Sequence, residues 1–86
     1  MDLRWAEWNM GRIAAYGVDP NEAEETFENV RSPFPRRIED DKCLAWGPTS
    51  AGRLIQVIFV LDEDGTVFVI HARDLSASEK RRMRRR

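Results

Sequence analysis

Three side chains in the second half of the chain have the types and spacing that suit the chemistry of a phosphate group. Arg53 opens an apolar run, and His71 and Arg73 lie two positions apart near the end of the next run. A guanidinium group is planar, stays charged and matches phosphate oxygens, and a histidine can take or give a proton near neutral pH. If one surface carries all three, it could bind a phosphodiester and transfer a proton beside it.

RNA is the phosphodiester that demands least from a protein, because its own ribose 2′-hydroxyl is the attacking group. The protein must align that hydroxyl, take its proton and stabilise the charge of the transition state. The acidic stretches at 39–41 and 62–64 fit solvated turns better than a magnesium site, and no glycine-rich phosphate loop is recognisable. We therefore expect no metal and no cofactor.

A plainer interpretation of the same residues stands beside this one. His71 near a strand end is more often a packed or half-exposed side chain, and Arg73 beside Asp74 could form a surface ion pair of little energetic value. The residue types alone do not decide between the two interpretations.

Two helices are expected in the first third of the chain. Residues 5–15 place two tryptophans and Ile13 near helical spacing, with Gly17 as a stop. A second helix begins after Asp19 as N-cap, with Pro20 at its first position. Its expected apolar side consists of Ala23, Thr26, Phe27 and Val30.

β-Branched and aromatic residues predict strands at about 42–46, 53–61 and 66–73. The string "DEDGT" between the last two suits a type I turn followed by a left-handed glycine, which pairs Asp62 with Thr66. Strict alternation from that pair predicts the residues on each face. One face would carry Arg53, Ile55, Val57, Val69, His71 and Arg73, and the other Gln56, Phe68 and Ile70. We therefore predict that the two arginines and the histidine share one face of a sheet.

The last segment has the signature of a capped helix. Ser76 and Glu79 are spaced as a capping box, so a helix should run from about Ala77 into the arginines, with Met83 as its main apolar anchor. The order is helix, helix, three or four antiparallel strands, helix. That order predicts an α+β fold.

The length, composition and charge of the chain limit the class of protein. The 86 residues are enough for one domain, spanning 1–86, and with 34% of them charged the core must be thin. A lone cysteine allows no disulfide within the chain and fits a reducing, cytoplasmic setting. The longest apolar run, interrupted by Gln56, is too short to span a membrane, and no signal peptide is evident. Residues 1–43 carry a net charge of −4 and residues 44–86 a net charge of +3, so one region could attract an anion.

Two stretches resemble blocks of the BrnT-type toxin family. They are "YGVDPNEAEETFEN" and "SAGRLIQVIFVLDEDGTVFVIHARDLSASEKRRMRR". The most specific part is the order glycine–arginine, strand, hairpin, strand, Ala-Arg, then a capped basic helix. The resemblance covers most of the chain apart from the middle.

The resemblance implies a ribonuclease toxin of a bacterial type II toxin–antitoxin pair, with a RelE-like fold. It implies a ribbon-helix-helix antitoxin as partner, in a toxin–antitoxin hetero-oligomer, and RNA as substrate. The functional arginines of the family correspond to Arg53 and Arg73. In this hypothesis His71 transfers protons, and the basic helix holds the RNA backbone through Lys80, Arg81 and Arg84.

The chain also departs from the family pattern. The Lys-His pair that precedes Gly-Val in the family is Ala15-Tyr16 here, and His71 stands where the family has serine. Either His71 and Tyr16 supply a rearranged site, or the protein is a catalytically inactive module that binds an antitoxin or RNA. A third interpretation is an unrelated small α+β domain with a solvated basic tail.

Overall fold

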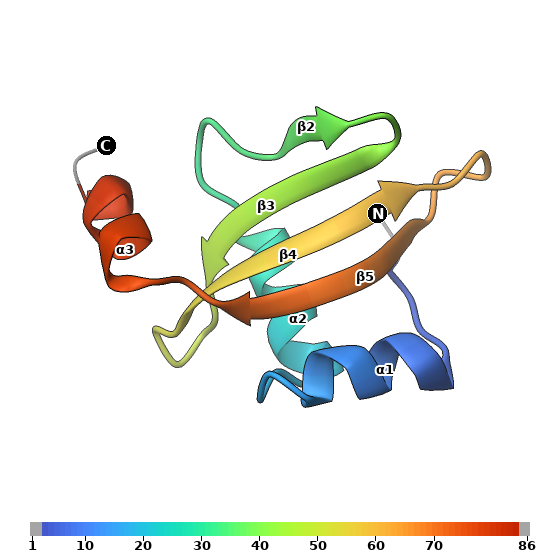
Figure 1. Cartoon of the computed structure of the whole chain (residues 1–86), viewed down its shortest axis with the longest axis horizontal. Coiled ribbons are helices and arrows are strands. Elements are labelled where there is room, and N and C mark those ends of the chain that lie inside the picture. The colour runs from blue at the N-terminus through green and yellow to red at the C-terminus, as the bar shows by residue number, and fades with distance from the viewer. Residues whose placement is uncertain (1–2, 85–86) are drawn as a thin grey trace.

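Helices cover one face and one edge of a five-stranded sheet (Figure 1). The computed structural model describes residues 3–84. In chain order the elements are β1 (Leu3–Arg4), α1 (Glu7–Ala14), α2 (Pro20–Glu28), β2 (Arg36–Glu39), β3 (Lys42–Pro48), β4 (Leu54–Leu61), β5 (Val67–Asp74) and α3 (Ala77–Arg84). This arrangement confirms the α+β fold.

The strand order is β1–β5–β4–β3–β2, antiparallel throughout except that β1 runs parallel to β5. The expected three or four antiparallel strands correspond to β2–β5, and β1 adds a fifth. Neither β1 nor β2 carries a clear apolar pattern, because β1 has two residues and β2 is exposed along its whole length. Pairing with a longer neighbour makes each of them a strand.

The predicted caps of α2 and α3 are confirmed. The Asp19 carboxylate accepts from the backbone N–H of Glu22, whose own carboxylate accepts from the backbone N–H of Asp19. Ser76 and Glu79 bond reciprocally in the same way at the start of α3. Each pair satisfies backbone donors that the first helical turn leaves free.

A buried asparagine joins α1 to the sheet. Asn9 is 0% exposed; its amide donates to the carbonyl oxygens of Arg4 and Val69, and its side-chain oxygen accepts from the backbone N–H of Ala6. A buried amide needs such partners, because an unpaired one would cost stability. The Asn9 side chain thus holds α1 against both β1 and β5.

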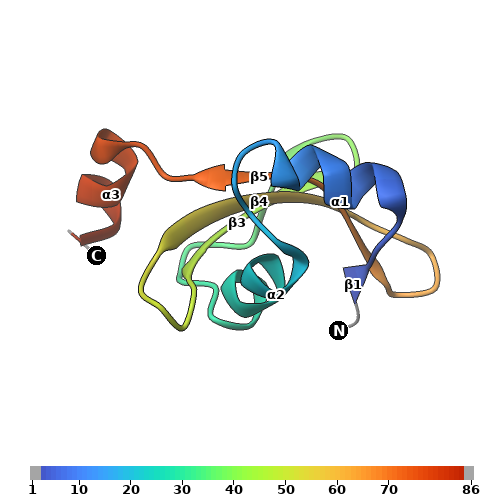
Figure 2. The same ribbon diagram turned by 90° about the horizontal axis from the view of Figure 1, so that it is seen from below.

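The apolar residues form two clusters, one on each face of the sheet. Under α1 and α2 lies the larger cluster, which includes Ile13, Ile55, Val57, Val69 and Ala72. At one end of the opposite face lies a smaller cluster of Phe34, Leu44, Trp46, Leu75 and Met83. We call these the closed face and the open face, because α2 packs across β3 and β4 on the first, whereas α3 lies at one end of the sheet (Figure 2).

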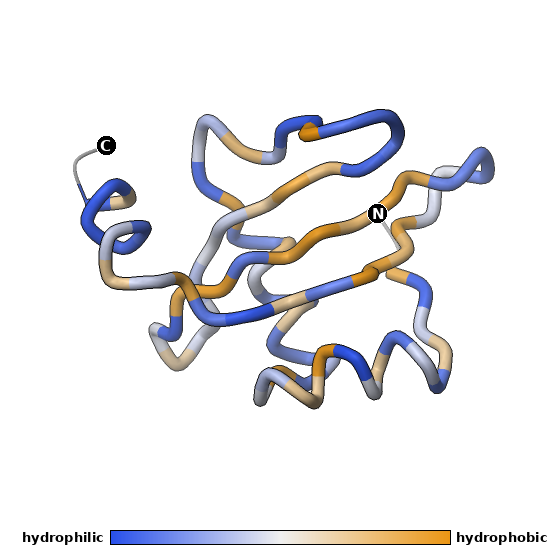
Figure 3. Tube along the Cα trace, in the orientation of Figure 1, coloured by the Kyte–Doolittle hydropathy of each residue, from blue (hydrophilic) through white to orange (hydrophobic). Residues whose placement is uncertain are grey.

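The hydropathy of the chain follows this division. Strands β4 and β5 are predominantly hydrophobic, whereas α3 is predominantly hydrophilic (Figure 3). Met83 is buried and holds α3 against the open face, as predicted. No helix within residues 3–84 is both long and apolar enough to cross a membrane.

Candidate functional site

The hairpin that should place the site forms its predicted turn. The backbone N–H of Asp62 donates to the carbonyl of Thr66 at 2.9 Å, and Gly65 has the left-handed φ of +86° that such a turn requires. From there β4 and β5 pair in the predicted register as far as Phe59 and Val69.

A β-bulge then reverses the faces. Phe59 pairs with Val69 but Ile58 pairs with His71, so Ile70 is an extra residue without a partner on β4. A one-residue shift exchanges the two faces of a strand. The prediction that Arg53, His71 and Arg73 share a face is therefore wrong: the last two lie on the open face, and Arg53 reaches toward the closed side.

The pattern of buried residues along β5 explains the bulge. Val67, Val69 and Ala72 are buried, so the inward spacing changes from two to three. Strict alternation would have turned His71 and Arg73 into the core and left Ala72 outside. The cost of burying a charged guanidinium is the signal that could have revealed the bulge.

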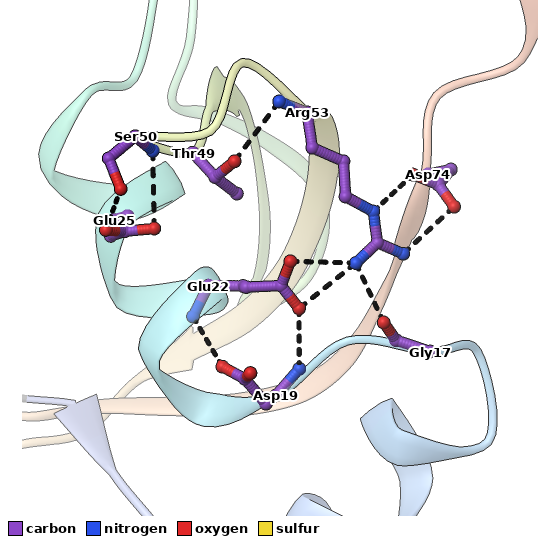
Figure 4. A network of polar contacts seen from close by, with 8 residues as sticks. All are labelled: Gly17, Asp19, Glu22, Glu25, Thr49, Ser50, Arg53 and Asp74. Carbon is purple, nitrogen blue, oxygen red and sulfur yellow. Dashed lines mark hydrogen bonds and ion pairs between the residues drawn. The ribbon is translucent and has the colours of Figure 1, made fainter.

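Arg53 lies at the centre of a network of hydrogen bonds and ion pairs (Figure 4). Its Nε and Nη2 donate to the two carboxylate oxygens of Asp74 at 2.7 and 3.0 Å, and its Nη1 donates to Glu22 and to the carbonyl of Gly17. Hydrogen bonds to Asp74 and then Glu22 raise the pKa of Arg53. The network joins β4, β5 and the start of α2, so every nitrogen of this guanidinium already has an acceptor.

Arg73 is held in a second network, on the open face. Its two Nη atoms donate to the carboxylate of Glu79 at 2.8 and 2.9 Å, and Nη2 also donates to Gln56. The Gln56 oxygen accepts a further bond from the indole N–H of Trp46 at 3.0 Å. The bond to Arg73 lowers the pKa of Glu79 to about 2. Arg73 thus ties the first turn of α3 to the sheet.

His71 has no such partner. No other residue within 3–84 forms a hydrogen bond with its buried Nδ1, and the Tyr16 ring meets the imidazole edge-on at a centroid distance of 4.6 Å. Partial burial lowers the pKa of His71, and the positive charges of Arg12 and Arg73 lower it further. The imidazole is therefore neutral at pH 7 and able to accept a proton.

His71 lines an open groove of about 510 Å³ between α1 and the open face. The other lining residues are Trp8, Arg12, Lys42, Ile58 and Ile70. Spacing in the sequence placed Trp8 in the first helix, but no sequence signal had singled out Arg12 or Lys42 for function. The four-residue spacing from Trp8 to Arg12 to Tyr16 is the signal that would have placed them on one side of a helix.

The predicted RNA-binding residues lie on α3, beyond the end of β5 and separate from α1 (Figure 1). Lys80 is half-buried, and Arg81 and Arg84 are exposed. Between them Arg82 lies over the Trp46 ring at 5.1 Å and adds to the anchoring of the helix. Residues 3–84 hold no cluster of three or more His, Cys, Asp or Glu side chains placed to bind a metal ion.

Comparison with known proteins shows a similarity of fold. No protein-family model and no curated protein matches the chain. Among solved structures, the chain is similar to the ribonuclease toxin BrnT of Brucella abortus, with a TM-score of 0.72 and 26% sequence identity. The match covers 88% of this chain and 97% of that one. The chain therefore has the fold of a BrnT-type ribonuclease toxin, as the resemblance of its sequence indicated.

Proposed function

We propose that this protein is a ribonuclease toxin that cleaves RNA without a metal ion. In this reaction the ribose 2′-hydroxyl gives up its proton and attacks the adjacent phosphorus, the bond to the 5′-oxygen of the next nucleotide breaks, and that oxygen takes a proton from the protonated base or from water. The products are a 2′,3′-cyclic phosphate and a 5′-hydroxyl. The observation that carries the proposal is His71, whose buried Nδ1 has no hydrogen-bond partner within residues 3–84, in a cation-lined groove on a BrnT-type fold.

His71 would take the proton of the attacking hydroxyl, because a neutral imidazole in a site of positive charge is a competent base near pH 7. Arg73, two residues on and on the same face, would contribute positive charge near the phosphate while Glu79 holds its guanidinium. Lys80, Arg81 and Arg84 would bind the RNA backbone beyond the groove. We leave Arg53 out of the site, because its donors are already engaged on the other side of the sheet.

Purified protein and a short RNA in EDTA test this proposal directly. We expect cleavage with cyclic-phosphate ends, no cleavage of RNA whose 2′-hydroxyls are methylated, and a loss of at least about 100-fold in His71→Ala. Glu63→Ala, on the exposed hairpin turn, is the matched control and should cleave like wild type. Cutting of the methylated RNA would exclude the 2′-hydroxyl mechanism, and full activity in His71→Ala would remove the histidine from it. Unchanged cleavage in Arg73→Ala would likewise remove that arginine.

A second candidate is a non-catalytic module that keeps the toxin fold. It is favoured by the engagement of both Arg53 and Arg73 with carboxylates, and by Ala15-Tyr16 in place of the Lys-His pair of the family. Either candidate would act in the cytoplasm with a ribbon-helix-helix antitoxin encoded next to it. Expression without that neighbour separates them, because a toxin arrests growth and an inactive module does not.

A further inference from the structure

An exposed stripe of α1 and the turn that follows it faces the His71 groove. Trp8 and Arg12 are four residues apart on α1 and so lie on the same side of the helix, and Tyr16 follows in the turn after it. Trp8 is 50% exposed and Tyr16 is 54% exposed, while Asn9 and Ile13 form the buried side of α1. Two large aromatic side chains thus remain in solvent with a cation between them.

Each aromatic ring of the stripe is held at the sheet without being buried. Trp8 packs on Phe68 at a centroid distance of 5.2 Å, and Tyr16 packs on His71 at 4.6 Å. These contacts restrict the rings and leave much of each exposed. Restrained aromatic surface beside positive charge is the arrangement on which unpaired nucleic-acid bases stack.

Arg12 differs from the other arginines near the site. Both Arg53 and Arg73 donate to carboxylates, whereas Arg12 forms no hydrogen bond or ion pair with any residue within 3–84. Its guanidinium lies 5.8 Å from the Trp8 ring centroid and lines the groove with His71. The other lysine or arginine of the groove, Lys42, already pairs with Glu39. An anion entering the groove therefore meets Arg12 as its available cation.

We propose that this stripe is the RNA-recognition element and that it selects single-stranded RNA. Arg12 binds the phosphate presented to His71, and Trp8 and Tyr16 receive the bases on its two sides. Paired bases are stacked within a duplex and cannot reach the rings, so a duplex is excluded. This inference rests on the proposed RNA substrate and adds to it the strand state and the residues that read it.

Binding to a fully 2′-O-methylated RNA oligonucleotide tests the stripe apart from cleavage. Measured by fluorescence anisotropy, Arg12→Gln and Trp8→Leu should each weaken binding about tenfold, and Trp8→Phe should recover most of the loss. Arg37→Gln removes the same charge from an exposed position on β2 and should change affinity less than about threefold. The same oligonucleotide in a duplex should bind at least about tenfold more weakly. Circular dichroism confirms that each variant is folded.

The pH dependence of kcat/KM distinguishes an electrostatic role of Arg12 from a purely structural one. Loss of the positive charge in Arg12→Gln should raise the pKa of His71 and shift the acid limb of the profile to higher pH. Equal binding of wild type, Arg12→Gln, Trp8→Leu and the duplex would overturn the inference while leaving the ribonuclease activity standing. Binding that follows the expected pattern without any cleavage would support the stripe and exclude the enzyme.

Discussion

Arg53 and Arg12 both flank the turn between the two N-terminal helices, but their surroundings differ completely. Arg53 makes hydrogen bonds to two carboxylates and a backbone carbonyl, and these bonds clamp β4, β5 and α2 together. Arg12 lines an open groove and has no hydrogen bond or ion pair to any described residue from 3 to 84. An arginine whose donors are all engaged stabilises a fold, whereas one with free donors can bind a ligand. Substitutions on the closed side should therefore change stability, and those in the groove should change cleavage.

The largest effect on stability should come from the packing of α2 on β3. A Cβ at Gly47 would lie 2.7 Å from the carbonyl oxygen of Thr26 and 2.8 Å from that of Asn29. Because both are backbone atoms, Gly47→Ala should lower the free energy of unfolding by about 2–3 kcal/mol, measured by urea denaturation. Gly11→Ala is the control, since nothing lies within 4 Å of its Cβ and alanine favours helix. A Gly47→Ala variant as stable as wild type would show that the closed face is not tightly packed.

Arg53→Met tests the difference between Arg53 and Arg12 most directly. It leaves Asp74 and Glu22 without their cation, so the free energy of unfolding should fall by about 2 kcal/mol. Arg81→Met, at an exposed position of α3, should change it by less than about 0.5 kcal/mol. The folded Arg53→Met protein should cleave RNA within about threefold of wild type. A 100-fold loss in a fully folded variant would return Arg53 to the site, as the family resemblance implies.

The attachment of α3 to the sheet should weaken as the pH falls. The folded-state pKa of Glu79 is lowered from 4.5 to about 2, so its bond to Arg73 contributes stability above pH 4.5 that is lost as the pH falls toward 2. Glu79→Gln should lower the free energy of unfolding by about 1 kcal/mol at pH 7, and the difference from wild type should shrink between pH 4.5 and 2. Glu63→Gln, on the exposed turn, is the control. A Glu79→Gln difference that is constant with pH would contradict the pairing.

The smallest effect is expected at the Tyr16 hydroxyl. Tyr16→Phe keeps the ring that packs against His71, so cleavage should change less than about twofold if only the ring acts. A loss of tenfold or more, measured on the same RNA, would make the hydroxyl a proton-transfer group. That result would favour the rearranged site in which Tyr16 and His71 act together.

Local signals in the sequence determined where α2 and α3 begin and where the β4–β5 hairpin turns. Capping pairs at Asp19 and Ser76 act over three residues, and the "DEDGT" turn over five, so each could be predicted without knowledge of the fold. The short strands β1 and β2 could not, because their pairing depends on partners far away in the chain. The same holds for the hydrogen bonds of Asn9, which join three elements.

The sequence by itself determined that the chain is α+β, that two arginines and a histidine flank one hairpin, and that a capped basic helix follows. Only the tertiary structure decided which of these residues meet. One extra residue at Ile70 turned His71 and Arg73 to the open face, because the core accepts Ala72 and excludes a guanidinium. The packing of α1 along β5 then placed Arg12 and Trp8, rather than Arg53, beside the histidine.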